Sequence, residues 1–392
     1  MKAFFHWVHQ RFFFILIFFL GMSLWAANQL PEDDLAILLG VSMVLKEILL
    51  QVMPWLILGC AFNCLYALKH KGLGLLILGL GLICLSNFFS TWIGYSLFHM
   101  LPTQPVLKLD EAMNHAILKP AFELHLPKLI KNEWGLVVGL LLGAILGRSK
   151  SLYAQSLYHI SQKWVYGLLN YVLIPVLPIF ICGFFIKLAF EGVLTQIFYT
   201  YAALTLVLVL SYLGYLGVMY WVAAGFQIKK ALSAVKNVLP AAWIGFSAMS
   251  SLAALPVSLK AAQQNTHNAD IVGGILPVST NVHLVGDSIG IPLMALAILA
   301  AFGQTFPSLE QYLWFSLFFV AAKFSVAAVP GGGILVMLPI LAQYLGFSGE
   351  MSALITALYL LLDPIITSVN VLGNGMFVML LGKRRSTKFV TR

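Results

Sequence analysis

Four polar residues recur at helical spacing in an otherwise apolar stretch near the C-terminus. They lie four, three and four residues apart, so a helix would carry on one face Asp363, Thr367, Asn370 and Asn374. If this stretch crosses a membrane, its aspartate costs about 2.5–3.5 kcal/mol on insertion scales and needs a cationic partner. The ammonium group of a small bound molecule is one such partner, and a structural hydrogen-bond cluster between helices is the alternative.

A second polar group lies upstream, where an apolar run contains Ser279, Thr280, Asn281, His283 and Asp287. His283 and Asp287 are four residues apart, so a continuous helix would place the imidazole beside the carboxylate. Such a pair can relay a proton or hold a cation. A buried histidine with satisfied hydrogen bonds is an equal alternative.

The composition indicates that the solvent around these residues is lipid. Apolar residues make up 60% of the 392 residues, charged residues make up 9%, and the mean hydropathy is +0.93. Soluble proteins carry about 25% charged residues, so this chain cannot cover a water-facing surface. A disordered chain, collagen and a disulfide scaffold are excluded. The cysteines lie in apolar runs without metal-ligand spacing, and we interpret them as packing residues: Cys60, Cys64, Cys84 and Cys182.

Apolar runs long enough to cross about 30 Å of hydrocarbon recur along the chain. We predict an all-α polytopic membrane protein with eight transmembrane helices, at about 8–28, 36–68, 73–99, 133–148, 160–190, 197–225, 271–302 and 350–382. The first run lacks a small-residue cleavage site, so we interpret it as a span and not as a signal peptide. Two further segments, 229–260 and 311–346, are apolar but interrupted.

Lysine and arginine gather at alternate ends of the predicted spans, and this bias sets the orientation. They occur at Lys2, Arg11, Lys69, Lys71, Arg148, Lys150, Lys229, Lys230 and 383–388, whereas 31–34, 191–196 and 303–311 carry none. We therefore predict an integral cytoplasmic (inner) membrane protein with both termini in the cytoplasm. The lysines of the long segment 100–132 fall on the outside, but long loops are weak determinants. The net charge of +9 then reflects orientation and implies no nucleic-acid partner.

Both interrupted segments contain small residues and helix breakers at their middle. The first reads Ser-Ala-Met-Ser-Ser-Leu-Ala-Ala-Leu-Pro at 247–256, and the second reads Ser-Val-Ala-Ala-Val-Pro-Gly-Gly-Gly at 325–333. Non-helical backbone at membrane depth persists only where protein buries it or where it lines a wet cavity. We predict two re-entrant helical hairpins with tips near 250–253 and 330–333, in an inverted repeat with the substrate between the tips. Two kinked spanning helices are the alternative.

These motifs together resemble the dicarboxylate/amino acid:cation symporters, which include archaeal aspartate and mammalian glutamate transporters. The resemblance covers nearly the whole chain of a divergent member and rests on Val52-Met53-Pro54, Ser250 to Pro256, Leu276-Pro277, Val329 to Gly333, and Asp363 to Gly373. It implies a homotrimer with an elevator mechanism. Residues 1–228 would form the scaffold and trimerisation region, with the third span joining the moving part, and 229–392 the core of the transport domain.

The resemblance also implies the substrate site. The carboxylate of the substrate would be held by the two tips and the last span, through Ser250, Ser251, Val329, Pro330, Gly331, Gly333 and Asn370. Asp363 and Thr367 would take the amino group. The family arginine that pairs with a side-chain carboxylate falls on Ile366, and another arginine of some members falls on Met249. A desolvated, unpaired carboxylate is costly, so we expect a small, neutral amino acid as substrate.

The coupling ion is also affected by departures from the family pattern. The family sodium motif Asn-Met-Asp-Gly-Thr reads His283 to Asp287 here, so its aspartate has become Val285, and a second acidic ligand has become Asn374. Three replacements for sodium are open: a carboxylate at Asp287, protons on His283 and Asp287, or Lys323 as a tethered cation. Asn370 would contribute beside them. For Lys323 itself we expect, slightly ahead of a role at the site, that its side chain snorkels to the outer interface.

The predicted function is therefore cation-coupled secondary transport of a small amino acid, with Na⁺ or H⁺ as the coupling ion, no other cofactor, and lipid and substrate as partners. A symporter of dicarboxylates or acidic amino acids is one alternative, and a non-transporting, substrate-binding regulator with the same fold is another. An intramembrane enzyme is disfavoured because no base is arranged near the serines at 250–251. A passive channel has little use for binding residues this costly.

Overall fold

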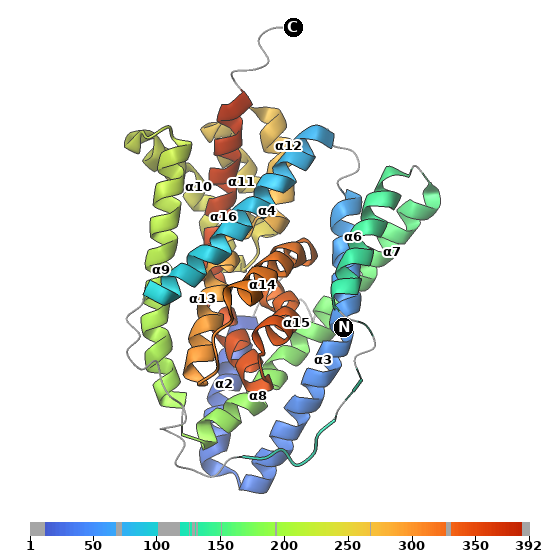
Figure 1. Cartoon of the computed structure of the whole chain (residues 1–392), viewed down its shortest axis with the longest axis vertical. Coiled ribbons are helices and arrows are strands. Elements are labelled where there is room, and N and C mark those ends of the chain that lie inside the picture. The colour runs from blue at the N-terminus through green and yellow to red at the C-terminus, as the bar shows by residue number, and fades with distance from the viewer. Residues whose placement is uncertain are drawn as a thin grey trace.

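The computed structural model describes residues 12–67, 73–100, 118–124, 126–127, 130, 132–149, 151–192, 194–266, 268–326 and 331–385. Every regular element within these ranges is a helix, which confirms the predicted all-α class for that part of the chain (Figure 1). A helix pairs its own backbone N–H and C=O groups, so it needs no neighbouring strand in lipid. Val329 and Pro330, which were predicted to belong to the second tip, lie outside the described residues.

The helices follow the predicted apolar runs closely. In chain order they are α2 (Phe12–Gln29), α3 (Glu32–Ala67), α4 (Leu73–Met100), α6 (Asn132–Arg148), α7 (Leu152–Leu168), the π-helical η1 (Leu169–Leu173), α8 (Ile174–Phe190), α9 (Leu194–Ala223), α10 (Ile228–Ala248), α11 (Ser251–Asn265), α12 (Ala269–Val282), α13 (Val285–Ala301), α14 (Leu309–Ala322), the 3₁₀-helical η2 (Lys323–Ser325), α15 (Gly332–Leu345) and α16 (Gly349–Arg385). The span predicted at 160–190 begins earlier, at Leu152, and contains the π-helical turn.

Length and composition allow six helical runs among the described residues to cross a membrane. They are Glu32–Tyr66, Leu78–Met100, Leu152–Phe190, Tyr201–Ala223, Ile271–Ala301 and Gly349–Gly382. Trp134–Arg148 is apolar but shorter. The molecule therefore has the helices of a membrane protein.

Glycines on α6 allow it to pack directly on the backbone of α3. Gly135, Gly139 and Gly143 are four residues apart and face Pro54, Leu58 and Phe62, respectively. A Cβ atom at Gly139 would overlap the carbonyl oxygen of Leu58. Small residues at this spacing are typical of close helix pairs in membranes, where packing and not the hydrophobic effect joins the helices.

The second half of the chain is built around α13, which is buried along nearly its whole length. It packs against α4, α9 and α16, and α16 in turn packs against α10, α11 and α12 (Figure 1). A helix that is apolar on all sides is expected in the interior of a bundle. The polar residues of α13 and α16 consequently lie inside protein.

Both interrupted segments contain a break between two helices, as predicted. The first break follows α10, where Met249 has a left-handed backbone (φ 48°), and Ser250 then caps α11. The second follows η2, and α15 begins after Gly331, whose φ of 72° suits glycine. Each break leaves the N-terminus of a new helix inside the fold.

A third break was not predicted. The span predicted as one helix at 271–302 is two helices, α12 and α13, separated at His283 and Leu284. Asn87 of α4 satisfies the interrupted backbone: its Nδ2 donates to the Val282 carbonyl (2.7 Å), and its Oδ1 accepts from the Leu284 N–H (3.2 Å). The prediction was wrong because the side chain that hydrogen-bonds the unpaired backbone groups at the break, Asn87, comes from a distant part of the sequence.

The α3–α6 contact generates a stability prediction. Gly139→Ala should lower the free energy of unfolding by about 1–3 kcal/mol, because the added methyl meets backbone that cannot move aside. The matched control is Gly217→Ala on α9, where a Cβ meets no atom within 4 Å. The control should be neutral or stabilising by up to about 1 kcal/mol. Unfolding of both purified variants in detergent measures the difference, and equal stability would contradict the assigned contact.

Candidate functional site

A small polar cavity lies where the three breaks meet α16. Its volume is about 30 Å³, room for roughly two water molecules. The described residues that line it are Met249, Ser250, Ser251, Thr280, Asn281, Leu284, Asp287, Val326, Gly333, Tyr359, Asp363, Thr367 and Asn370. None of these is a lysine, arginine or histidine.

The cavity receives the N-terminal ends of α11, α13 and α15. Ser251 begins α11, Asp287 lies in the first turn of α13, and Gly333 lies in the first turn of α15. The first N–H groups of a helix have no partner within that helix, and the helix dipole adds partial positive charge there. The breaks therefore turn the middle of an apolar bundle into a place that favours anionic oxygen.

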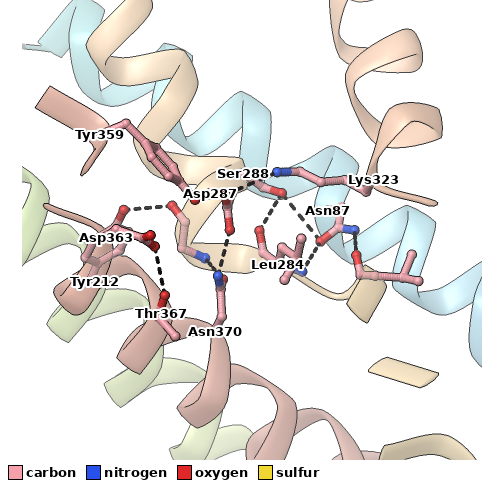
Figure 2. Close-up of polar contacts among 12 residues, drawn as sticks. Asn87, Tyr212, Leu284, Asp287, Ser288, Lys323, Tyr359, Asp363, Thr367 and Asn370 are labelled. Atoms are coloured by element: carbon pink, nitrogen blue, oxygen red, sulfur yellow. Dashed lines mark hydrogen bonds and ion pairs between the residues drawn. The ribbon is translucent and has the colours of Figure 1, made fainter. Parts of the chain in front are cut away.

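Asp363 links α16 to the second break. Its Oδ2 accepts from the Gly331 N–H at 2.9 Å. Its Oδ1 accepts from the Thr367 hydroxyl at 2.9 Å (Figure 2). The residue is only 3% exposed. Both donors are neutral, so an ionised Asp363 has no countercharge among them and can receive a cation.

Asp287 is the second buried carboxylate, and three neighbours hold it. Tyr359 donates its hydroxyl to Oδ1 at 2.6 Å, and Asn370 donates Nδ2 to Oδ2 at 2.6 Å. The Lys323 ammonium lies 3.8 Å from Oδ1. The Asn370 amide is itself oriented, because its Oδ1 accepts from the Gly286 N–H at 2.8 Å (Figure 2).

Lys323 does not reach the membrane interface. Its side chain is fully buried, at 0% exposed, and its ammonium lies 4.4 Å from the centre of the Phe319 ring. The expectation that it snorkels outward is wrong. From the 3₁₀-helical turn η2, the side chain points towards Asp287 of α13 (Figure 2).

His283 and Asp287 do not pair as a continuous helix would require. The break places His283 at the end of α12, where its Nε2 lies 2.9 Å from the Ser86 hydroxyl and its ring packs on Phe377. Among the described residues, the His283 Nδ1 and the Asn374 Oδ1 have no hydrogen-bond partner. Neither residue lines the cavity.

The structure brings together most of the predicted substrate residues but not all. Ser250, Ser251, Gly333, Asp363, Thr367 and Asn370 line the cavity, together with the predicted ion-coupling residue Asp287. Ile366 is buried at 0% exposed and lies outside the lining, and Gly331 reaches the site only through its N–H on Asp363.

Sequence reasoning missed three residues of this network. Tyr359 lies four residues before Asp363, so extending the polar face of the last span by one turn would have found it. Asn87 carried only the weak signal of an amide in an apolar run. Tyr212, whose hydroxyl donates to the Gly286 carbonyl at 2.7 Å, resembled any other aromatic residue of a span.

The hydrogen bond to Asp287 generates the second prediction. Tyr359→Phe should lower the free energy of unfolding by about 1.5–3 kcal/mol, because a hydrogen bond to a buried charge is lost. Tyr215→Phe on α9 is the control, since that half-buried hydroxyl makes no hydrogen bond within the described part of the chain. Denaturant unfolding in detergent compares the two variants, and a loss of the same size in both would refute the assigned role.

Comparison with known proteins identifies the family to which the chain that forms this site belongs. The family model described as the sodium:dicarboxylate symporter family matches residues 134–384. An excitatory amino acid transporter of Caenorhabditis elegans is 31% identical over 137 residues, or 34% of this chain and 27% of that protein. The excitatory amino acid transporter 5 of Homo sapiens is 27% identical over 149 residues, or 38% and 26%. The excitatory amino acid transporter 3 of Oryctolagus cuniculus is 32% identical over 127 residues, or 32% and 24%.

These alignments span about a quarter of the length of the curated relatives, whereas the family model covers well over half of this chain. The resemblance found in the motifs is thereby confirmed. The chain belongs to the sodium:dicarboxylate symporter family.

Proposed function

We propose that this protein is a secondary active transporter that carries a small, neutral amino acid across the cytoplasmic membrane. The observation that carries the proposal is the charge of the cavity. Asp363 is held by neutral donors, whereas the charge of Asp287 is matched by Lys323. One negative charge and several helix N-termini remain, and a zwitterion is complementary to both.

In this proposal the substrate ammonium binds Asp363 and Thr367, in charge-assisted hydrogen bonds. The substrate carboxylate faces the start of α11, at Ser250 and Ser251, and the first turn of α15, at Gly333. Asn370 uses one amide hydrogen on Asp287, and its second can be donated to the substrate. The cavity is small, so it must widen to admit the molecule.

The identity of the neighbouring side chains supports a neutral substrate. Met249 lines the cavity, and Ile366 is buried next in sequence to the lining residue Thr367. The resemblance predicts arginine at Ile366 in the family, and at Met249 in some members. A side-chain carboxylate of the substrate would then be desolvated without a cation among the described lining residues. Leaving a charged group unpaired costs more than the 1–3 kcal/mol or so of an unsatisfied neutral group.

An acidic amino acid or a dicarboxylate is the second candidate. The family description and the names of the relatives favour it, and Lys323 is a buried cation close behind the cavity. Lys323 would have to break its ion pair with Asp287 to bind the carboxylate of such a substrate. A non-transporting regulator has less support, because the family consists of transporters.

We also propose the architecture that the family implies. The chain would cross the membrane eight times with both termini in the cytoplasm, and α10–α11 and α14–α15 would be re-entrant hairpins. The core at 229–392 would move as an elevator, with the third span, against a trimeric scaffold formed from 1–228. The meeting of both hairpin breaks at one cavity supports this division. The family description names sodium as a coupling ion.

A ligand screen tests the substrate class. L-alanine and L-serine should raise the melting temperature of the purified protein, and L-aspartate and succinate should bind about tenfold more weakly or not at all. Each ligand is measured at matched ionic strength, in sodium chloride and in choline chloride. Counterflow of the labelled best ligand in proteoliposomes then tests transport. Stronger stabilisation by aspartate or succinate would select the second candidate.

Removal of the cavity charge tests the site. Asp363→Asn should weaken binding of the neutral amino acid by about 10- to 100-fold, because an ionic hydrogen bond to the ammonium worth about 1.5–3 kcal/mol is lost. Asp34→Asn, at an exposed acid in the first turn of α3, is the matched control and should bind normally. Isothermal titration gives both dissociation constants. Unchanged affinity in Asp363→Asn would rule out this carboxylate as the ammonium partner.

A further inference from the structure

Lys323 is an unusual group for the interior of a membrane protein. Its side chain is 0% exposed, and within the described part of the chain its Nζ has no hydrogen-bond partner. The Phe319 ring lies 4.4 Å away, close enough for a cation–π contact. A buried ammonium is costly unless an anion compensates it. Lys323 forms an ion pair with Asp287, whose Oδ1 lies 3.8 Å from Nζ.

Asp287 in turn requires a cation. Its hydrogen bonds from Tyr359 and Asn370 are short, but both donors are neutral and leave the charge uncompensated. Lys323 supplies the missing positive charge without a direct hydrogen bond. The two charges therefore balance across 3.8 Å.

A sodium ion does not fit at Asp287 while Lys323 is present. A hard cation binds through anionic oxygen, and the Lys323 ammonium already lies 3.8 Å from Oδ1. Lys323 would repel an ion brought to Oδ1.

We propose that Lys323 is a tethered cation that permanently takes the place of a bound metal cation at Asp287. The ammonium belongs to the chain, so it neutralises Asp287 in every state and cannot be exchanged with the solution. Sodium therefore does not bind at Asp287 in the wild-type protein. If the amino acid binds beside this pair, as the proposed function states, its binding is not coupled to sodium binding at Asp287.

Removing the ammonium should create the sodium site that it replaces. In Lys323→Ala the Asp287 carboxylate faces an empty space of about the size of the lost side chain. Replacing choline chloride by sodium chloride should then raise the melting temperature of the ligand-free variant by several degrees. The gain should vanish in the double variant Asp287→Asn/Lys323→Ala, which has no carboxylate to hold the ion.

The ligand-free protein serves for this measurement, so it does not depend on the substrate assignment. Lys46→Ala is the matched control, because this lysine is partly exposed and is paired with Glu47. It should gain no sodium response. A merely structural lysine would give a less stable variant without new ion sensitivity, so that outcome overturns the proposal. If the screen also finds no amino acid that binds, the proposed function fails separately.

A second comparison covers the case in which Lys323→Ala does not fold. The charge-neutral variant Asp287→Asn/Lys323→Met removes both charges and keeps an apolar stem. Its response to sodium should equal that of the wild type, since neither protein holds sodium at this position. A wild-type sodium response that the neutral variant loses would show that sodium does bind Asp287, and would overturn the proposal.

With the amino acid found in the screen, the same variants give a second readout. Lys323→Ala should bind the amino acid at least about tenfold more tightly in sodium than in choline, because the ion restores the neutral Asp287 site. The ratio for the wild type should be no larger than that for the neutral double variant. A wild-type ratio as large as that of Lys323→Ala would contradict the tethered cation.

Discussion

The structure depends on one constraint: Asp287 and Asp363 are buried beside the cavity in a largely apolar bundle, and their hydrogen bonds and countercharges must come from the chain or from what it binds. Lipid cannot supply them at that depth. Asp363 accepts from a backbone N–H and a hydroxyl, and Asp287 accepts from a tyrosine and an amide with an ammonium beside them. The surrounding helices are arranged so that these groups meet.

This constraint explains why three helices are broken at the same level. A continuous helix offers no N–H groups along its length, whereas each break exposes the first N–H groups of a new helix. The α12–α13 break is maintained by a single amide, that of Asn87, which pairs with backbone on both sides of it. Because Asn87 lies on α4, the site is tied to that helix as well as to α16. The proposed movement of α4, the third predicted span, with the core would require a contact of this kind.

The chain combines the frame of its family with a different distribution of charge. The match over 134–384 covers the helices that form the cavity. Ile366 lies where the resemblance predicts an arginine, and a fully buried lysine, Lys323, lies beside Asp287. The described residues that line the cavity thus include no positively charged side chain, whereas Lys323 lies next to the lining residue Asp287. Substrate selection and ion coupling both depend on charge, so either can differ from the relatives while the helices remain similar.

The sequence by itself determined the class of the protein, most helix boundaries, the two interrupted segments and the polar face of the last span. These features depend on composition and on local periodicity, which a single chain displays directly. Only the tertiary structure decided which partners these residues meet. His283 and Asp287 separate because Asn87, 197 residues before Leu284, supports a break between them. Lys323 points inward because Asp287 compensates its charge there. The pairing of buried charges depends on residues that are distant in the chain, so it cannot be predicted from local sequence patterns.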